Sequence, residues 1–163
     1  MGCNMIKSIF LVCVLAVTVY LAVTAWEDHK TCEVTRWKHL IGGIPAIILY
    51  GLHWNQHGME ENAMILAFAI IYVVVGFAGI YGFADGLVLA NLSLFFGSIG
   101  GAAGSGVVLL IMIIAAFSFL ICHVVKSIVT RRKMFQRISG ALIPHILVGY
   151  LIVMGIVICN VTG

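Results

Sequence analysis

Residues 107–125 read VVLLIMIIAAFSFLICHVV, and residues 126–137, which follow directly, read KSIVTRRKMFQR. The first stretch contains no Asp, Glu, Lys or Arg, and it matches the length of about 20 residues that a helix needs to cross the hydrocarbon of a bilayer. The second contains five of the nine Lys and Arg residues of the chain, and such residues gather on the cytoplasmic side of membrane proteins. The two stretches therefore predict a membrane-spanning helix that ends at the cytoplasmic surface.

The composition of the whole chain agrees with this prediction. Of its 163 residues, 63% are apolar and 9% are charged, and the mean hydropathy is +1.16. A soluble domain carries roughly 25% charged residues, so this chain has too few charges to cover a water-facing surface. Disordered chains are poor in apolar residues and rich in charge, which excludes that class as well. We therefore expect residues 1–163 to form a single membrane-embedded domain, an all-α, polytopic integral membrane protein.

Six apolar runs are candidates for transmembrane helices. They are residues 5–25, 40–54, 63–80, 86–101, 107–125 and 141–159. Four of them fit the usual span of about 17–25 residues, whereas the second and fourth are short and would recruit polar flanking turns. Alternation with the period of a β-strand is absent, which favours helices. About six transmembrane helices are therefore expected.

The positions of Lys and Arg predict the orientation. Eight of these nine residues lie in two segments, residues 30–38 and residues 126–137, which follow the first and the fifth run. Basic loops stay cytoplasmic, and with six helices the loops after the first, third and fifth helix share one side. The loop after the second run carries Glu60 and Glu61 and no basic residue, as expected on the external side. Both termini are then predicted to be external.

The chain contains only two aspartates, and both fall at the predicted cytoplasmic boundary. Asp28 follows the first run, and Asp85 opens the fourth run in YGFADG (residues 81–86). An ionisable residue next to hydrocarbon is costly and indicates a functional site by default. The alternative for Asp85 is a helix N-cap, where its charge suits the helix dipole, and the alternative for Asp28 is a solvated juxtamembrane face. Gly82 and Gly86 permit close backbone approach around Asp85.

Two aspartates that meet at such a boundary can hydrolyse an amide. Because two neighbouring carboxylates cannot both ionise cheaply, they share one proton. The ionised member takes a proton from water, and the protonated member donates to the carbonyl oxygen, so no covalent intermediate is needed. Asp28 and Asp85 are therefore the candidate catalytic pair.

Three motifs together resemble the type IV prepilin peptidase family, which is related to the preflagellin peptidases and belongs to the GxGD-type intramembrane aspartic proteases. In that family, five residues separate the first aspartate from an Ile-Pro-Asn sequence. Here five residues separate Asp28 from VTR at residues 34–36. The second motif, usually Gly-x-Gly-Asp, is GFAD at residues 82–85, with Ala84 in place of a Gly. The third is LIPHILVG at residues 142–149, which is similar to the start of the family's last helix and contains Pro144.

The resemblance implies an intramembrane aspartic endopeptidase that needs no metal or organic cofactor. Its partners would be the lipid bilayer and a prepilin-like membrane protein, an Flp-type pilin or pseudopilin of a type IV pilus or secretion system. Cleavage would separate a short basic leader from an apolar helix at the cytoplasmic face of the cell membrane. Asp28 and Asp85 would be catalytic, and Glu27 and Glu33 are placed to meet the basic leader. The N-terminal methyltransferase region of the larger enzymes is missing, so the chain resembles the short, peptidase-only form.

Other functions fit parts of the sequence. A small proton- or cation-coupled transporter would bind its ion at Asp85 in a broken helix, although neither internal repeats nor polar residues at mid-membrane are visible. A weak or inactive family member acting in pilus assembly is the other alternative, because Ala84 departs from the motif. His53 and His57 have a spacing that suits a metal, but no third ligand lies close by in the sequence, so no metal site is predicted. A net charge of +3 gives no support for a nucleic-acid partner.

Overall fold

The computed structural model describes residues 2–31, 36–130 and 141–162, and every regular element within them is helical. The elements are α1 (Gly2–Thr31), α2 (Arg36–His53), the 3-10 helix η1 (Trp54–Gln56), α3 (Met59–Phe77), α4 (Phe83–Thr130) and α5 (Ile143–Thr162). The expectation of an all-α fold is thereby confirmed.

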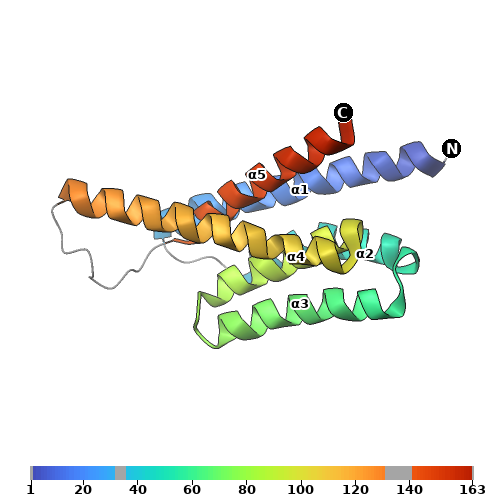
Figure 1. Ribbon diagram of the computed structural model, residues 1–163, viewed down its shortest axis with the longest axis horizontal. Coiled ribbons are helices and arrows are strands. Elements are labelled where there is room, and N and C mark those ends of the chain that lie inside the picture. Colours follow the sequence, from blue (N-terminus) through green and yellow to red (C-terminus); the bar gives the residue numbers. More distant parts are fainter. Residues whose placement is uncertain (1, 32–35, 131–140, 163) are drawn as a thin grey trace.

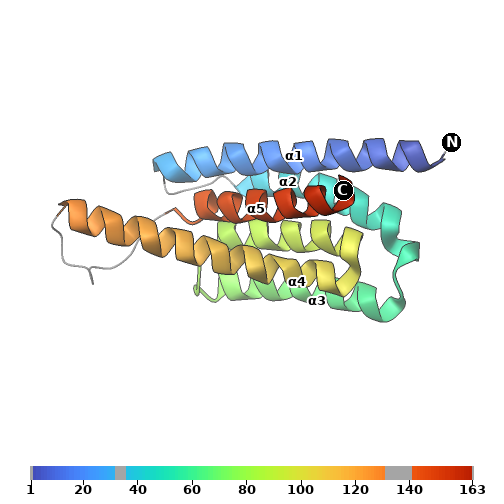
Figure 2. The ribbon, with the colours of Figure 1, turned by 45° about the horizontal axis from the view of Figure 1, so that its top comes forward.

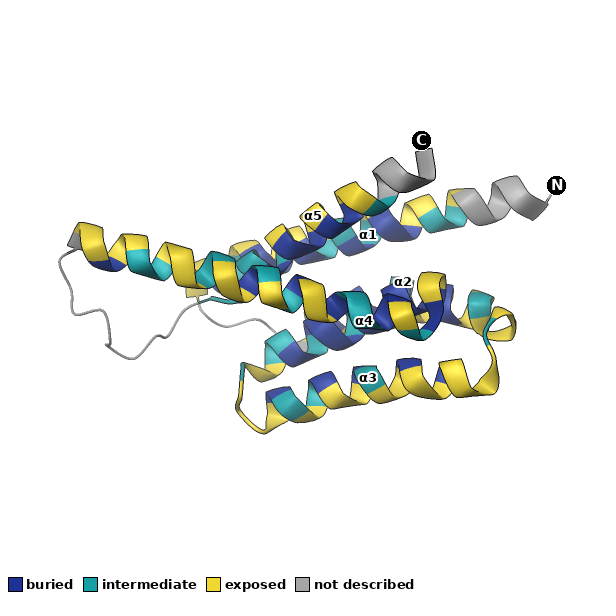
Figure 3. Cartoon of the chain, viewed as in Figure 1, coloured by how far each residue is buried: buried dark blue, intermediate teal, exposed yellow. Residues whose placement is uncertain are grey.

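Three of the described helices are long and apolar enough to cross a membrane. These stretches are Ser8–Thr31, Met59–Phe77 and Phe83–Val129, and a shorter apolar stretch covers Ile143–Val157. The outward faces of the helices are exposed, as Figure 3 shows for α3 and α4, and many of the exposed side chains are large and apolar. Exposed apolar surface on this scale is typical of a protein that contacts another apolar phase. The structure thus agrees with a membrane protein, while the number of crossings stays a prediction.

Helix α4 is interrupted by two glycines at which the chain doubles back (Figure 1). Gly100 and Gly101 have non-helical backbone angles, and the φ of Gly101 is 62°, a left-handed conformation that favours glycine. The two parts of α4 then pack against each other, since the Ser105 hydroxyl donates to the Ser93 carbonyl at 3.0 Å. A Cβ on Gly104 would collide with the Phe96 carbonyl oxygen. The break lies where the sequence predicted a turn between its fourth and fifth runs.

The helices lie side by side, and their connections gather at two ends of the bundle (Figures 1 and 2). One end holds the C-terminus of α1, the α3–α4 connection and the N-terminus of α5. The opposite end holds the α2–α3 connection, the break in α4 and both chain termini. We call the first of these the aspartate end, because Asp28 and Asp85 lie there. This grouping is the one that the Lys and Arg positions predicted, although which end faces the cytoplasm stays a prediction.

The core lies between the helices and consists of large apolar side chains. Leu21, Leu49, Ile65, Phe95 and Tyr150 are almost completely buried, and they come from all five α-helices. Burying each such side chain stabilises a fold in water by about 1.5–3 kcal/mol, whereas in a bilayer close packing takes over as the main contribution. The core therefore joins the helices into one bundle and fixes how the aspartate end is assembled.

Several helix boundaries differ from the predicted runs, and two of these differences concern the aspartates. Helix α1 continues through Thr31, so Asp28 lies within its last turns and not beyond the helix. Glu27 and Lys30 are good helix formers, and the Thr31 hydroxyl donates to the Glu27 carbonyl at 3.0 Å. Helix α4 begins at Phe83, three residues before the predicted apolar run, which places Asp85 inside the first turn.

Candidate active site

Asp28 binds the beginning of another helix. Its Oδ2 atom accepts a hydrogen bond from the backbone N–H of Ile143, the first residue of α5, at 3.1 Å, and the Asp28 residue is only 8% exposed. The first N–H groups of a helix have no partner within the helix, and the helix dipole favours a negative charge there. Asp28 therefore reaches from α1 to the N-terminus of α5 and holds the two helices together.

Pro144 contributes to this arrangement by starting α5. A proline has no N–H, and it is best tolerated in the first turn of a helix, where that donor is not needed. The turn closes through hydrogen bonds from the N–H groups of His145 and Ile146 to the Leu142 carbonyl, at 2.9 and 3.1 Å. The first and third sequence motifs thus meet at one hydrogen bond. The sequence did not predict this pairing, because a backbone N–H leaves no residue-type signal.

Asp85 accepts a backbone hydrogen bond at the start of its own helix. Gly82 occupies the N-cap position of α4, and its N–H donates to Asp85 Oδ2 at 3.0 Å. The alternative in which Asp85 is itself the N-cap does not match the structure, since Asp85 lies three residues beyond Gly82 and its side chain reaches back to it. That geometry is half of a capping box. A Cβ added to Gly82 would lie 2.8 Å from Asp85 Oδ2, so the glycine leaves room for the carboxylate.

Gly86 allows α4 to approach α3 closely beside Asp85. A Cβ at Gly86 would lie 2.8 Å from the Tyr72 carbonyl oxygen and 3.2 Å from the Cα of Gly76. The Tyr81 hydroxyl donates to the same Tyr72 carbonyl at 2.8 Å, so the α3–α4 connection is tied back onto α3. Ala84, between Gly82 and Gly86, is half-buried against the core.

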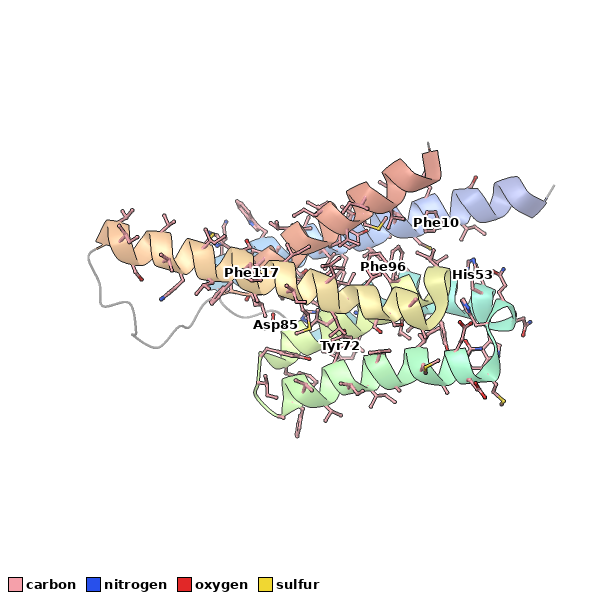
Figure 4. All side chains as sticks on the ribbon, viewed as in Figure 1. Phe10, His53, Tyr72, Asp85, Phe96 and Phe117 are labelled. Carbon is pink, nitrogen blue, oxygen red and sulfur yellow. The ribbon has the colours of Figure 1, made fainter. Side chains whose placement is uncertain are left out.

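The two aspartates lie within electrostatic range of each other. Asp28 comes from α1 and Asp85 from α4, and the charge of Asp28 acts on Asp85. Asp85 is half-buried at the start of α4, where Figure 4 labels it. Tyr81 stands in the connection before α4, and burial, followed by the nearby Asp85 carboxylate, raises the pKa of its hydroxyl. Tyr81 thus stays a protonated hydrogen-bond donor over a wide pH range.

Glu27, predicted to meet a basic leader, already has a basic partner. The Lys38 ammonium on α2 lies 2.6 Å from Glu27 Oε2 on α1. This ion pair joins the two helices at the aspartate end, and a basic ligand at Glu27 would compete with Lys38. Glu33, the other predicted leader contact, lies outside the described residues.

A buried histidine beside this ion pair was also missed by the sequence analysis. His39 is 2% exposed, and its Nδ1 lies 2.7 Å from the Tyr20 hydroxyl of α1. Its backbone carbonyl accepts a hydrogen bond from the Asn91 amide of α4 at 3.0 Å. His39 thereby links three helices. The one feature of the sequence that could have drawn attention to His39 is its position directly before the apolar run at residues 40–54.

The two histidines whose spacing suits a metal lie at the opposite end of the bundle. His53 Nδ1 is 2.9 Å from the Leu49 carbonyl oxygen. His57 lies 3.1 Å from the Ser98 carbonyl oxygen through Nε2 and 3.3 Å from Glu61 through Nδ1. The His53 ring therefore bonds within α2, and the His57 ring joins the α2–α3 connection to α4 and α3.

The fold and site define a helical protein with apolar helices of membrane-spanning length and two aspartates, from α1 and α4, at one end of the bundle. No protein-family model matches the chain, and neither a curated protein nor a solved structure matches it.

Proposed function

We propose that the protein is an intramembrane aspartic endopeptidase that removes the short basic leader from type IV prepilin-like precursors. One observation carries the proposal: two aspartates far apart in the sequence lie at the same end of the bundle within electrostatic range. The third motif supports it, because the N-terminus of α5 holds Asp28 directly. Ionisable side chains beside apolar spans are otherwise rare and costly.

The proposed chemistry divides one proton between Asp28 and Asp85. The ionised carboxylate removes a proton from a water molecule as the oxygen of that water attacks the scissile carbonyl carbon, while the protonated carboxyl donates to the carbonyl oxygen. The tetrahedral intermediate then collapses and the C–N bond breaks: the leaving nitrogen takes the proton that the first carboxylate removed from water, and the hydroxyl proton returns to the second carboxylate as the carbonyl re-forms. The roles need one charged and one neutral carboxyl, which a close pair of aspartates supplies.

The proposed topology has six crossings, with the aspartate end at the cytoplasmic face and both termini external. Support comes from the connections, which alternate between the two ends of the bundle (Figure 2), and from Lys38 and Lys126. Both lysines lie at the aspartate end, Lys38 beside Glu27 and Lys126 near His29 and Pro144. A leader ahead of an apolar substrate helix would therefore reach the aspartates from the cytoplasm.

A second candidate, a non-catalytic family member acting in pilus assembly, is favoured by the hydrogen bonds of the aspartates. Each carboxylate accepts a backbone N–H at a helix start, Asp28 from Ile143 and Asp85 from Gly82. A purely structural role would explain both residues without any proton transfer. The two candidates differ in what an asparagine does, since its amide oxygen still accepts the N–H but cannot act as the acid or base.

The test is a cleavage assay with the purified protein in detergent and a prepilin substrate. Asp28→Asn and Asp85→Asn should each lose nearly all leader removal, because a positioned acid or base contributes about 10²–10⁴-fold. The double variant should be little worse, since the two groups act as one unit. Glu60→Gln, which removes a carboxylate at the opposite end of the bundle, should cleave like the parent. Normal cleavage by either asparagine variant would exclude the catalytic pair and leave the structural role.

A further inference from the structure

A pocket of about 370 Å³ lies at the aspartate end, between the second part of α4 and the start of α5. Its volume falls within the range of about 300–1,000 Å³ typical of small-ligand sites. His29 of α1, His123 and Lys126 of α4, and Pro144 and His145 of α5 contribute to its wall. The hydrolytic chemistry proposed above uses none of the histidines or the lysine.

The α4 side of the pocket is formed by one face of the helix, which carries a histidine and a lysine beside a phenylalanine. Phe119, His123 and Lys126 follow one another at helical spacings of four and three residues, which places them on the same side of α4. Other faces of this part of α4 carry Ile121 and Phe117, 61% and 62% exposed; Figure 4 labels Phe117. A lysine and a histidine on a helix surrounded by apolar side chains are energetically costly in a membrane, so their presence indicates a functional site.

The hydrogen bonds of the pocket histidines leave one polar atom without a partner. His145 is accounted for, because its Nδ1 lies 2.8 Å from the Ser118 hydroxyl and its ring packs edge-on against Phe119. His123 Nε2, in contrast, is shielded from solvent and has no hydrogen-bond partner within the described part of the chain. Buried polar atoms normally have a partner. A ligand in the pocket would supply one for His123.

The charge of the pocket favours an anion. Its lining includes Lys126 and three histidines, and no Asp or Glu is among the described residues of the wall. The nearest carboxylate in sequence is Asp28, beside His29, and it is engaged with the Ile143 N–H.

We propose that this pocket binds the phosphate of an anionic phospholipid headgroup. The Lys126 ammonium supplies charge-assisted hydrogen bonds of the kind that phosphate oxygens accept, and His123 Nε2–H donates a further one. Apolar faces of α4 and α5 flank the pocket, so the acyl chains of the same lipid lie against surface that the bilayer covers. A Lys/His pocket at the end of apolar helices is suited to headgroup binding from the cytoplasmic leaflet. The inference does not depend on peptide cleavage.

Native mass spectrometry of the full-length protein in neutral detergent tests the proposal, with phosphatidylglycerol and phosphatidylcholine as probes. We expect one phosphatidylglycerol to bind at least ten-fold more tightly than phosphatidylcholine. Lys126→Ala should weaken phosphatidylglycerol binding about ten-fold or more, and Lys126→Arg should preserve it. Lys30→Ala is the matched control: it removes the same charge at the same end, but Lys30 lies over the Trp26 ring, 4.4 Å from its centroid, and is not part of the pocket wall.

His123→Leu provides a second variant, which removes the imidazole and leaves the Lys126 ammonium in place. It should weaken phosphatidylglycerol binding several-fold, because it removes the buried Nε2 donor. Equal weakening by Lys126→Ala and Lys30→Ala would show diffuse attraction in place of a site and would overturn the proposal. Equal binding of the two lipids would also overturn it. Displacement of phosphatidylglycerol by millimolar inorganic phosphate would show that free phosphate is the ligand and would refute the lipid assignment.

Discussion

At the scale of single residues, both aspartates combine a structural contact with a proposed chemical one. A carboxylate that accepts a hydrogen bond from a backbone N–H at a helix start is stabilised in its charged form, and the hydrogen bond also fixes the orientation of the side chain. Asp28 is fixed by Ile143 and Asp85 by Gly82, so each keeps one oxygen engaged while the other is available for further contacts. Proton-transfer groups need such positioning, because rate depends steeply on geometry. The same hydrogen bonds are therefore expected for a peptidase and for a non-catalytic protein, and only substitutions of the aspartates distinguish the two candidate functions.

Replacement of Asp28 separates its hydrogen bond from its charge. Asp28→Ala leaves the buried Ile143 N–H without an acceptor and should lower the free energy of unfolding by about 1–2 kcal/mol, the usual cost of losing a helix cap. Asp28→Asn keeps an acceptor oxygen and should cost less than half as much. Denaturant unfolding in detergent, followed by circular dichroism, measures both. An equal loss in the two variants would mean that the charge, and not the hydrogen bond, holds α5 to α1.

Gly82→Ala tests whether the position of the Asp85 carboxylate matters for cleavage. The added Cβ would lie 2.8 Å from Asp85 Oδ2, so the carboxylate must move or rotate. We expect prepilin cleavage to fall by about 10–100-fold, as misplacements of this size do in other active sites. Gly51→Ala is the control, since nothing lies within 4 Å of a Cβ at that position, and its cleavage rate should match the parent. An unchanged rate in Gly82→Ala would argue against a catalytic Asp85.

At the scale of helices, the crossing of α3 and α4 depends on two glycines. Gly76 and Gly86 let the backbones approach until a Cβ on Gly86 would lie 3.2 Å from the Gly76 Cα, and small residues are the usual means of close helix packing in membranes. This crossing sets where α4 begins, and therefore where Asp85 lies relative to α1.

Gly86→Ala should consequently destabilise the bundle. Its Cβ would lie 2.8 Å from the Tyr72 carbonyl oxygen, a backbone atom that cannot rotate away, and overpacking of this kind costs about 1–3 kcal/mol. Gly155→Ala in α5 meets nothing within 4 Å and should be neutral or stabilising by up to about 1 kcal/mol, because alanine is the better helix former. Thermal unfolding of both variants in detergent provides the comparison. A Gly86→Ala protein as stable as its parent would show that α3 and α4 do not depend on this contact.

The sequence predicted the helices better than it predicted their ends. Apolar runs of helical length and the interruption between the fourth and fifth runs were readable, because hydropathy is a local property of the sequence. The extension of α1 past residue 25 was not, since a tertiary contact of Asp28 with α5 supports it. Asp85 was found by its rarity beside apolar runs, but its position three residues into α4 required the Gly82 hydrogen bond. Contacts made through a backbone N–H cannot be predicted from residue types, because every residue except proline has this group.

At the scale of the whole molecule, the two ends of the bundle differ in their lysines. Among the described residues, the aspartate end carries Lys30, Lys38 and Lys126 beside its three carboxylates, whereas the opposite end carries Glu60, Glu61 and a single lysine, Lys7, near the start of α1. Lys and Arg near membrane helices remain on the cytoplasmic side, so this asymmetry predicts one orientation for the entire bundle. The proposed function requires that orientation, because the leader would approach the aspartate end from the cytoplasm. In the same orientation, the proposed lipid site meets the headgroups of the cytoplasmic leaflet.

Cysteine labelling in intact cells tests the orientation. Met59 at the start of α3 is 87% exposed, and Trp37 at the start of α2 is 73% exposed, so both positions tolerate substitution without loss of core packing. In a background without other cysteines, Met59→Cys should react with a membrane-impermeant maleimide added outside, and Trp37→Cys should react only after the cells are permeabilised. The two sites belong to adjacent helix starts, so a bundle that crosses the membrane must give them opposite accessibility. The reverse pattern would place the aspartates outside, where a cytoplasmic leader never meets them, and would defeat the peptidase proposal, whereas lipid binding in detergent would be unaffected.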